Sequence, residues 1–233
     1  MSIPYFYQEG VNGLGASILN EETSKHCIQV LRMKTGEALH LTDGKGGLLK
    51  AVIVTEHKRN CEVNILESTF QEHKGRKVSI AISLLKNTNR LEWFLEKATE
   101  MGITEIIPLL CQRTEKQQFR FDRMNQILIS AMLQSQQTWL PVLHQPTKLE
   151  EVIAKAVNMQ KLIAHCEETN KQPVPQLAIA NEVQILIGPE GDFTSTEINF
   201  ALQKGYLPTS LGYTRLRTET AGVVAASLLI NVQ

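Results

Sequence analysis

The chain has 233 residues, of which 42% are hydrophobic and 21% charged, so it can bury a sizeable core and is not expected to be disordered. Lys+Arg and Asp+Glu balance at 24 each, and this neutrality gives no overall preference for a polyanionic partner. Four scattered cysteines, no signal-peptide pattern and no apolar run of membrane-spanning length indicate a reduced, cytoplasmic protein without structural disulfides, a metal site or a membrane partner.

The first part of the chain, residues 1–72, carries strand and turn signals. The glycine-rich stretch 43–47 (DGKGG) predicts a hairpin connection between two strands. In residues 61–66, Cys61, Val63 and Ile65 alternate with polar or outward positions, which predicts a half-buried strand. We therefore expect a small antiparallel barrel or sheet, followed by a polar linker over residues 71–77.

The second part, residues 73–233, alternates strand and helix signals, which is typical of a mainly parallel sheet covered on both faces. Short apolar runs predict buried strands over 78–85, 103–110, 161–165 and 183–188. Residues 73–140 carry ten Lys and Arg against six Asp and Glu, which is compatible with a locally positive face or simply with a solvated helix surface.

Between these strands the sequence contains helix signals. An apolar face predicts a helix that Gly102 ends, formed by Leu91, Phe94, Leu95, Ala98 and Met101. Residues 122–137 predict another helix. Thr147 with Glu150, and Thr194 with Glu197, have the spacing of capping boxes that begin two more helices, the second ended by Gly205. The last helix, over 219–230 with Thr218 as its expected N-cap, is apolar nearly all round and should be buried.

One loop stands out at the end of a predicted strand, in residues 185–197 (ILIGPEGDFTSTE). Ligands of parallel sheets bind where the carboxyl ends of the strands meet the following loops. This loop lacks the lysine of a phosphate-binding loop and the G-x-G-x-x-G pattern, and its Glu190 and Asp192 would repel a pyrophosphate. A ligand that is neutral or cationic at this end is therefore expected, although a simple tight turn is the alternative.

A second loop, residues 210–222 (SLGYTRLRTETAG), places Arg215 and Arg217 just before the last helix. Cationic side chains oppose the dipole at a helix N-terminus, so they do not stabilise that helix. Arginine pairs well with planar anionic or carbonyl-bearing groups, which favours a nucleotide or base, whereas pairing with Glu219 or Asp192 is the structural alternative. Two unusual loops at strand ends of one sheet can converge on one pocket.

The stretches LIGPEGDFTSTEI and LGYTRLRTETAGVVAASLL together resemble the signature pair of the small-subunit rRNA uridine-N3 methyltransferases, the RsmE family of the SPOUT superfamily. The stretches HCIQVLRMKTGE, KNTNRLEWFLEKATEMGITEIIPL and AMLQSQQTWLP agree in order. The resemblance implies a PUA-like RNA-binding β-barrel over 1–72 and a SPOUT α/β domain with a trefoil knot over 73–233. It also implies a homodimer with the active site near the interface.

By the same resemblance the cofactor is S-adenosylmethionine, whose positive sulfonium and lack of phosphate suit the acidic glycine turn. The residues implied to bind adenine and ribose, largely through backbone groups, are Ile187, Gly188, Gly191, Leu211, Gly212 and Leu216. The loop with His165 is a weaker third candidate, because a lone histidine at such a place is more often structural.

The activity implied is methylation of N3 of a uridine in 16S rRNA, with the naked RNA or the small ribosomal subunit as partner. We expect Arg217 to stabilise the developing uracil anion, and Glu219 or Glu190 to accept the proton. The candidates for RNA contact, mainly through phosphates, are Arg32, Lys34, Arg113 and Arg120, with Lys116 and Arg123 beside them. Surface charge for solubility is the alternative for each of these cations.

The chain departs from the family pattern at three positions. Many members carry Glu where this chain has Leu133 and Arg where it has Gln137, and a third glycine is usual where it has Asp192. Two other functions stay open at this point: a related knotted enzyme that methylates a ribose 2′-oxygen, and a non-catalytic RNA-binding protein of ribosome assembly. The full-length pattern, with its N-terminal barrel segment, favours the uridine-N3 methyltransferase.

Overall fold

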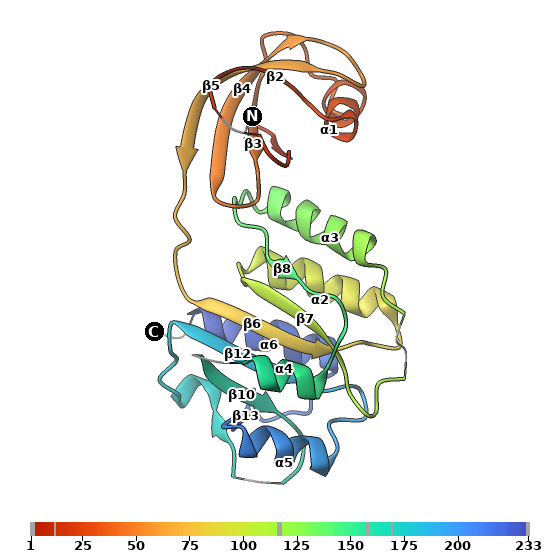
Figure 1. Ribbon diagram of the computed structural model, residues 1–233, viewed down its shortest axis with the longest axis vertical. Coiled ribbons are helices and arrows are strands. Elements are labelled where there is room, and N and C mark those ends of the chain that lie inside the picture. The colour runs from red at the N-terminus through yellow and green to blue at the C-terminus, as the bar shows by residue number, and fades with distance from the viewer. Residues whose placement is uncertain (1–2, 12, 116–117, 157–158, 169, 232–233) are drawn as a thin grey trace. The chain divides into compact units, whose positions relative to one another are not determined.

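A computed structural model describes residues 3–11, 13–115, 118–156, 159–168 and 170–231 of the chain (Figure 1). Lys116, one of the predicted RNA contacts, lies outside these residues. The chain divides into two compact units. The first unit comprises Met1–Lys74 and Met132–Leu140, and the second comprises Gly75–Ala131 and Pro141–Gln233.

The first unit is built on a five-stranded sheet in the order β1-β3-β4-β5-β2. Its strands are β1 (Tyr5–Tyr7), β2 (Gly15–Ile18), β3 (Ala38–Thr42), β4 (Gly47–Thr55) and β5 (Glu62–Phe70). Only the β1–β3 pair is parallel. A short helix, α1 (Glu21–Lys25), continues into a π-helical turn, η1 (His26–Val30).

Local sequence signals explain this sheet. The predicted hairpin joins β3 to β4, where Asp43 Oδ1 accepts hydrogen bonds from the backbone N–H groups of Lys45 and Gly47 at 2.8 and 3.0 Å. Cys61, Val63 and Ile65 are buried, which confirms the predicted alternation. Their side chains face the apolar core of this unit.

Residues 132–140 complete the first unit, although their sequence pattern did not indicate it. The indole N–H of Trp139 donates to the carbonyl of Gln71 at 2.8 Å, and Trp139 forms a backbone bridge with Lys45 in the hairpin. A Cβ atom on Gly46, which has φ +95°, would come within 2.7 Å of the Trp139 ring. The missing side chain at Gly46 therefore lets the indole pack directly on the hairpin.

The second unit contains a parallel sheet in the order β11-β13-β10-β12-β6-β7-β8, with β9 also paired to β7. Its strands are β6 (Lys77–Ser83), β7 (Glu105–Leu110), β8 (Val142–Leu143), β9 (Thr147–Lys148), β10 (Gln160–Ala164), β11 (Gln172–Pro173), β12 (Glu182–Ile187) and β13 (Leu207–Ser210). The expected α/β class, a mainly parallel sheet plus a small N-terminal sheet, is confirmed.

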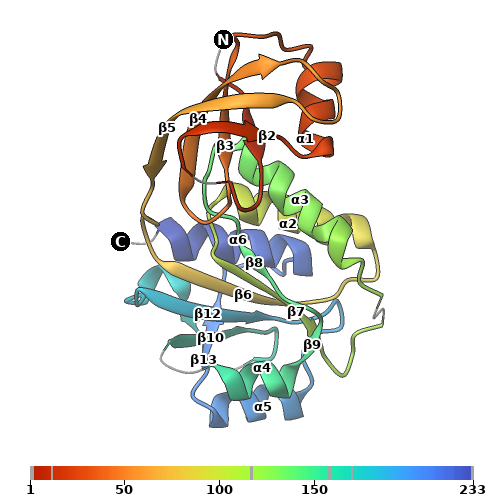
Figure 2. The same ribbon diagram turned by 45° about the horizontal axis from the view of Figure 1, so that its top comes forward.

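Helices cover both faces of this sheet. They are α2 (Thr88–Glu100), α4 (Leu149–Lys155), α5 (Ser195–Gln203) and α6 (Thr218–Asn231), with a 3₁₀ turn η2 (Val174–Gln176). A further helix, α3 (Phe121–Gln134), has its last residues in the first unit. Figure 2 shows α4 and α5 on one face, and α2 and α6 on the other. Helix α6 contacts α2, β6 and β12, and one side of it is buried, whereas its apolar residues Val223, Val224, Leu228 and Ile230 are only partly buried.

The helix ends test the capping predictions. Thr194 and Glu197 form a full capping box before α5, and Gly102 and Gly205 follow their helices with φ +85° and +83°. The box predicted from Thr147 and Glu150 is wrong. Thr147 is paired within β9 and its hydroxyl donates to the carbonyl of Gln145, so α4 begins without a side-chain cap. Helix α6 includes Thr218, one residue earlier than expected.

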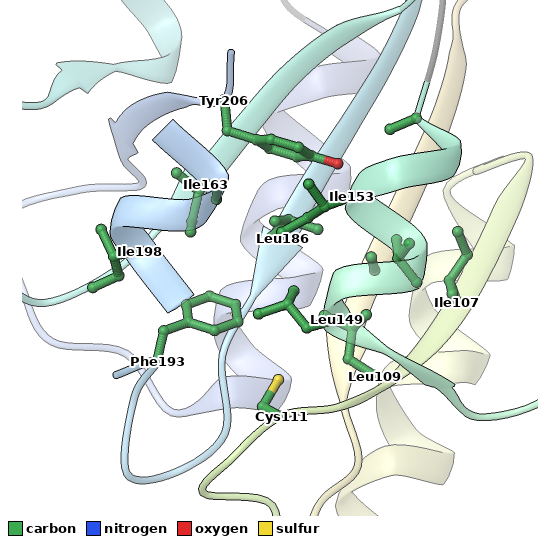
Figure 3. Packing of buried hydrophobic residues seen from close by; sticks show 14 residues of the cluster. Ile107, Leu109, Cys111, Leu149, Ile153, Ile163, Leu186, Phe193, Ile198 and Tyr206 are labelled. Carbon is green, nitrogen blue, oxygen red and sulfur yellow. The ribbon is translucent and has the colours of Figure 1, made fainter. Parts of the chain in front are cut away.

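One apolar layer lies between the sheet and helices α4 and α5 (Figure 3). Ile163 and Leu186 come from the central strands and meet Leu149 of α4 and Phe193, which precedes α5. The Tyr206 hydroxyl donates to Gln184 Oε1 at 2.5 Å within this layer, and burial raises the Tyr206 pKa. This packing fixes the ends of β10 and β12, from which the candidate site is built.

Candidate functional site

Three neighbouring parallel strands end at the same level. In the register of the sheet, Ala164 of β10 pairs with Ile187 of β12 on one side and with Thr209 of β13 on the other. The loops that follow these strands are therefore adjacent, although they are far apart in the sequence. Both unusual loops of the sequence are among them, and the loop that begins at His165 lies between the two.

These loops enclose a cavity of about 710 Å³. Its lining comes from all three loops and includes Glu190, Asp192, Lys171, Arg215 and Tyr213. Acidic groups come from the loop after β12, and arginines come from the loop after β13. The prediction that the two loops converge on one pocket is therefore confirmed.

Most of the residues predicted to bind cofactor or substrate line this cavity. They are Ile187, Gly188, Leu211, Gly212, Leu216 and Arg217. Gly191 is not part of the lining: its carbonyl accepts a hydrogen bond from Arg113 Nη1 at 2.6 Å on another side of the turn. The structure thus places six of these seven residues at one cavity, and their individual roles stay predictions.

The glycine turn after β12 has a shape that its sequence explains in part. A Cβ atom on Gly188 would lie 3.1 Å from the Phe193 ring, so the absent side chain lets the turn close over that ring. Asp192 has φ +64°, a left-handed conformation that disfavours most side chains. This backbone geometry is the physical reason why a glycine suits the Asp192 position.

Asp192 uses its side chain to join two loops of the cavity. Its Oδ2 accepts from the Cys166 backbone N–H at 2.7 Å, and its Oδ1 accepts from the Phe193 N–H at 2.8 Å. Asparagine and aspartate tolerate the left-handed region better than other residues because they can hydrogen-bond locally. The sequence identified Asp192 as a departure from the family pattern, but it did not indicate this bridge.

The two acidic candidates for proton acceptor differ in position. Glu190 lines the cavity and its Oε1 accepts from the Lys86 N–H at 3.2 Å. Glu219 is buried, 7% exposed, and lies outside the lining. Its Oε1 is 3.6 Å from Arg90 Nε, while its Oε2 has no hydrogen-bond partner among the described residues. Geometry therefore separates two residues that the sequence left equivalent.

Arg215 and Arg217 are both exposed and line the cavity. The structural alternative, pairing with Asp192 or Glu219, is not observed. The Asp192 carboxylate accepts two backbone N–H groups, and Glu219 is next to Arg90. The two guanidinium groups are thus available to a ligand.

His165, the weaker third candidate of the sequence, also lines the cavity. It is 7% exposed, and neither of its ring nitrogens has a hydrogen-bond partner among the described residues. Burial and the nearby Lys171 ammonium lower the pKa of His165, so the ring is neutral near pH 7. Lys171 Nζ donates to the His165 carbonyl at 2.9 Å.

The predicted RNA contacts have varied surroundings. Arg32, Lys34 and Arg120 are exposed, and Lys34 pairs with Glu56 at 3.2 Å. Arg113 donates to the carbonyls of Gly191 and Phe193, which gives it a structural role at the glycine turn.

Arg123 and Gln137 already have hydrogen-bond partners. Arg123 forms a two-point ion pair with Glu92 at 2.5 and 2.8 Å. Gln137 Nε2 donates to Ser135 Oγ at 2.8 Å, and Leu133 is half-buried.

Two kinds of feature, a metal-ligand cluster and a membrane-spanning helix, are absent from the described residues. Among residues 3–11, 13–115, 118–156, 159–168 and 170–231, no group of three or more His, Cys, Asp or Glu side chains is placed to hold a metal ion. In the same part of the chain, no helix has the length and apolar character needed to cross a membrane.

With this geometry in place, the chain can be compared with known proteins. Residues 72–230 match the family model of the RNA methyltransferase domain, and residues 19–66 match that of the RNA methyltransferase PUA domain. These two matches, which fall on the parallel-sheet unit with its cavity and on the small sheet, identify the chain as an RNA methyltransferase with a PUA domain. More narrowly, the chain belongs to the ribosomal RNA small subunit methyltransferase E family.

Similar proteins match most of this chain. A ribosomal RNA small subunit methyltransferase E of Synechocystis sp. is 30% identical over 209 residues, which cover 86% of this chain and 68% of that protein. A probable rRNA-methyltransferase from Porphyromonas gingivalis has a TM-score of 0.90 and 36% identity, covering 97% of this chain and 96% of that one. A ribosomal RNA small subunit methyltransferase E from Neisseria gonorrhoeae bound to S-adenosyl methionine has a TM-score of 0.89 and 27% identity, with coverage of 97% and 96%.

Proposed function

We propose that this RNA methyltransferase uses S-adenosylmethionine to methylate N3 of a uridine in the 16S RNA of the small ribosomal subunit. The observation that carries the proposal is the convergence of the two signature loops on one cavity of about 710 Å³. The Neisseria relative, which was solved with S-adenosyl methionine, matches this chain over 97% of its length and supports the choice of cofactor.

The residues of the cavity fit this cofactor. Glu190 and Asp192 place negative charge on the side of the cavity formed by the loop after β12, where a sulfonium or an ammonium group would be favoured. In this proposal Ile187, Gly188, Leu211, Gly212 and Leu216 hold the nucleoside part, and Gly191 shapes the turn behind it.

When bound, S-adenosylmethionine supplies an electrophilic methyl group. The residues of the chain then have to handle the proton and the charge of the uracil ring. Loss of the N3 proton leaves negative charge shared by N3 and the two carbonyl oxygens, and the exposed guanidinium of Arg217 stabilises that charge. We assign the proton to Glu190 rather than Glu219, because Glu190 lines the cavity.

The remaining parts of the proposal concern partners. Arg32, Lys34 and Arg120 are exposed cations that can contact RNA phosphates, whereas Arg113 is engaged at the glycine turn. We further propose a homodimer that acts in the cytoplasm, on the 16S RNA or on the assembled small subunit. The trefoil knot stays an implication of the family resemblance.

The test combines cofactor binding with mapping of the modified base. Titration calorimetry of the purified chain should detect S-adenosylmethionine, and mass mapping of rRNA from cells that lack the protein should show the loss of one 3-methyluridine. The intact gene should restore it. A missing ribose methyl group instead would indicate the 2′-oxygen enzyme, and no cofactor binding would indicate a non-catalytic RNA-binding protein.

The role of Arg217 has its own test. Arg217→Ala should bind S-adenosylmethionine with nearly unchanged affinity but lower the methylation rate by about 100-fold, which is the usual cost of losing one charge-stabilising group. Lys155→Ala, at an exposed cation of α4 outside the cavity lining, is the matched control. Near-normal turnover of Arg217→Ala would exclude this role.

A further inference from the structure

A second cavity shares one residue with the cavity of the signature loops, which is called the first cavity from here on. The second cavity has a volume of about 650 Å³, and its lining consists of residues 86–90, Glu115 and Glu190. Glu190 also lines the first cavity. A ligand in the second cavity and a cofactor in the first would therefore both lie beside Glu190.

The order of the strands explains why the two cavities adjoin. Ile187 of β12 pairs with Ile82 of β6, and β6 in turn pairs with β7. The loops after these three parallel strands therefore follow one another along the edge of the sheet that also forms the first cavity. The whole lining of the second cavity comes from these three loops and from the start of α2.

Polar contacts connect the three loops. The Lys86 N–H donates to Glu190 Oε1 at 3.2 Å, and Lys86 Nζ lies 2.8 Å from Glu115 Oε2. The loop after β6 is thus tied to the loop after β12 by the first contact and to the loop after β7 by the second. The first contact also holds the exposed carboxylate of Glu190 where the two cavities meet.

Arg90 lies at this cavity beside a buried carboxylate. Its Nε is 3.6 Å from Oε1 of Glu219, and the side chains of Arg90 and Glu219 are 38% and 9% exposed. Glu219 thus orients the guanidinium from the protein side, while the exposed part of Arg90 can reach a ligand. Arg217, two positions before Glu219, lines the first cavity. The start of α6 is therefore a second connection between the two cavities.

The charges of the lining indicate the chemical class of the ligand. The lining contains two cations and two acids, so its formal charge is zero: Lys86, Arg90, Glu115 and Glu190. Each cation already lies beside a carboxylate, Lys86 beside Glu115 and Arg90 beside Glu219. A phosphate group binds where cations are in excess. A neutral ligand with hydrogen-bond donors and acceptors, such as a nucleobase, suits this lining better.

Uracil matches the lining in its pattern of donors and acceptors. Its pairing edge presents the N3–H donor between two carbonyl acceptors. Glu190 accepts from such an N–H, while the guanidinium of Arg90 and the side-chain amide of Asn89 donate to carbonyl oxygens. Cytosine has an unprotonated acceptor at N3, which the Glu190 carboxylate would repel. The lining therefore favours uracil over cytosine.

We propose that the second cavity binds the uracil ring of the target nucleotide, with Arg90 as a substrate-binding residue and Glu219 as the residue that positions Arg90. This inference rests on the proposed methylation of uridine N3 and adds the place of the acceptor base. N3 gives its proton to Glu190 and forms a bond to the methyl carbon. The bond between that carbon and the sulfonium sulfur breaks, and its electron pair stays on the sulfur.

The test compares methylation with cofactor binding in the full chain. The substrate is the small ribosomal subunit or its 16S RNA, whichever wild type methylates, prepared from cells that lack the protein. Arg90→Ala should lower kcat/KM by about 100-fold, while its affinity for S-adenosylhomocysteine, measured by calorimetry, should stay close to that of wild type. Arg90→Lys keeps the charge but not the planar pair of donors, so its activity should be intermediate.

Lys97→Ala is the matched control. Lys97 lies on the same helix, its Nζ is 2.6 Å from Glu96 Oε1, and it is outside both linings. Its kinetics and its affinity for S-adenosylhomocysteine should equal those of wild type. A loss of methylation in Lys97→Ala as large as that in Arg90→Ala would show that any cation of α2 has this effect, and would overturn the specific role of Arg90.

The positioning role of Glu219 has a separate readout. Glu219→Gln keeps the shape of the side chain but loses the charge that orients Arg90, so kcat/KM should fall by about tenfold. In an Arg90→Ala background the same substitution should have almost no further effect, because Glu219 acts through Arg90. Equal losses in both backgrounds would show that Glu219 acts independently of Arg90 and would overturn this role.

Salt dependence distinguishes a base from a phosphate as the ligand of Arg90. Removing a cation that contacts an RNA phosphate lowers the slope of log KM against log salt concentration by about one. Arg90→Ala should leave this slope unchanged, because a neutral uracil ring releases no counterion. A slope lowered by about one would identify a phosphate at Arg90 and overturn the inference.

The remaining outcomes separate this inference from the proposed function. If wild type forms 3-methyluridine and Arg90→Ala does so at a near-normal rate, the inference is wrong and the proposed function stands. If Arg90→Ala does not fold, or loses S-adenosylhomocysteine binding together with methylation, Arg90 is a structural residue and the inference is wrong. A wild-type protein that binds neither S-adenosylhomocysteine nor S-adenosylmethionine would contradict the proposed function itself.

Discussion

At the scale of single residues, Asp192 combines an unfavourable backbone conformation with two favourable hydrogen bonds. Its φ of +64° costs about 1 kcal/mol or more for a residue with a side chain. Its carboxylate offsets this cost by accepting from the N–H groups of Cys166 and Phe193. A glycine at this position would avoid the strain, but the link between the two loops would be lost.

This balance predicts an order of stabilities for variants at this position. Asp192→Ala keeps the strain and loses both hydrogen bonds, so its free energy of unfolding should fall by about 1–3 kcal/mol. Asp192→Gly loses the same bonds but also the strain, and should be clearly more stable than Asp192→Ala. Urea unfolding at pH 7 measures both. Equal stabilities of the two variants would show that the backbone conformation is not strained.

At the scale of elements, the packing of α6 depends on one glycine. A Cβ atom on Gly222 would lie 2.6 Å from Cε2 of Phe94 on α2 and 2.9 Å from Cδ1 of Ile82 on β6. Glycine inside a helix costs about 1 kcal/mol relative to alanine. The close approach of α6 to α2 and β6 explains why a glycine stands at this helix position despite that cost.

Gly222→Ala should therefore lower the free energy of unfolding by about 1–3 kcal/mol, despite the better helix propensity of alanine. In a Phe94→Leu background the contact with the ring is removed while the contact with Ile82 remains, so the same substitution should cost clearly less than in wild type. A double-mutant cycle in urea measures the coupling. Additive effects of the two substitutions would rule out a clash with Phe94.

Helices α2 and α3 are joined by an ion pair that responds to pH. Arg123 Nε and Nη2 donate to the carboxylate of Glu92 at 2.5 and 2.8 Å, and these bonds lower the pKa of Glu92 below 4.5. Because the folded-state pKa is depressed, the pair stabilises the protein fully above the unfolded-state pKa. Its contribution is lost as the pH falls below about 4.5 and through the lowered value.

Glu92→Gln should lower the free energy of unfolding at pH 7 by about 0.5–1 kcal/mol, a modest value because Arg123 is more than half exposed. The difference between variant and wild type should shrink as the pH is lowered from 7 to 3. Urea unfolding over this range measures it. A difference that stays constant with pH would mean that the carboxylate charge of Glu92 is not involved.

At the scale of the whole molecule, the sequence correctly predicted structural features that depend on residues close together in the chain. The capping box of Thr194 and Glu197 and the helix end at Gly102 depend on residues a few positions apart, and both are confirmed. Thr147 and Glu150 have the same spacing as the confirmed box, but pairing of Thr147 in β9 with β7 overrides it. Periodicity and spacing contain no information about such pairing between distant strands.

The same contrast between short-range and long-range interactions applies to the candidate site. Its two signature loops were recognisable from residue types and from their place after strands, whereas the order of the strands brings His165 between them. The bridge from Asp192 to Cys166 spans 26 positions and depends on that order too. Contacts that depend on the tertiary arrangement, such as this hydrogen bond, were therefore not predicted from the sequence.

In the first unit, residues 138–139 contact the β3–β4 hairpin and the end of β5, which are far away in the sequence. Trp139 packs on the Phe70 ring with centroids 5.9 Å apart and donates its indole N–H to the Gln71 carbonyl. The Gly46 N–H donates to the Thr138 carbonyl, and the Gln71 N–H to the Gly46 carbonyl. A segment distant in sequence thus secures the end of the β4–β5 pair and the β3–β4 hairpin.

Trp139→Ala should destabilise the first unit more than the second. It removes the ring packed against Gly46 and one hydrogen bond, which corresponds to about 1–3 kcal/mol for a half-buried aromatic side chain. Hydrogen exchange at the Gly46 and Gln71 amides should accelerate by about tenfold or more, while exchange at Ile185 in β12 should stay nearly unchanged. Trp93→Ala, at an indole of α2 that is 43% exposed, should leave the hairpin amides protected. Equal acceleration in β12 would mean that the two units unfold together and that Trp139 stabilises the chain as a whole.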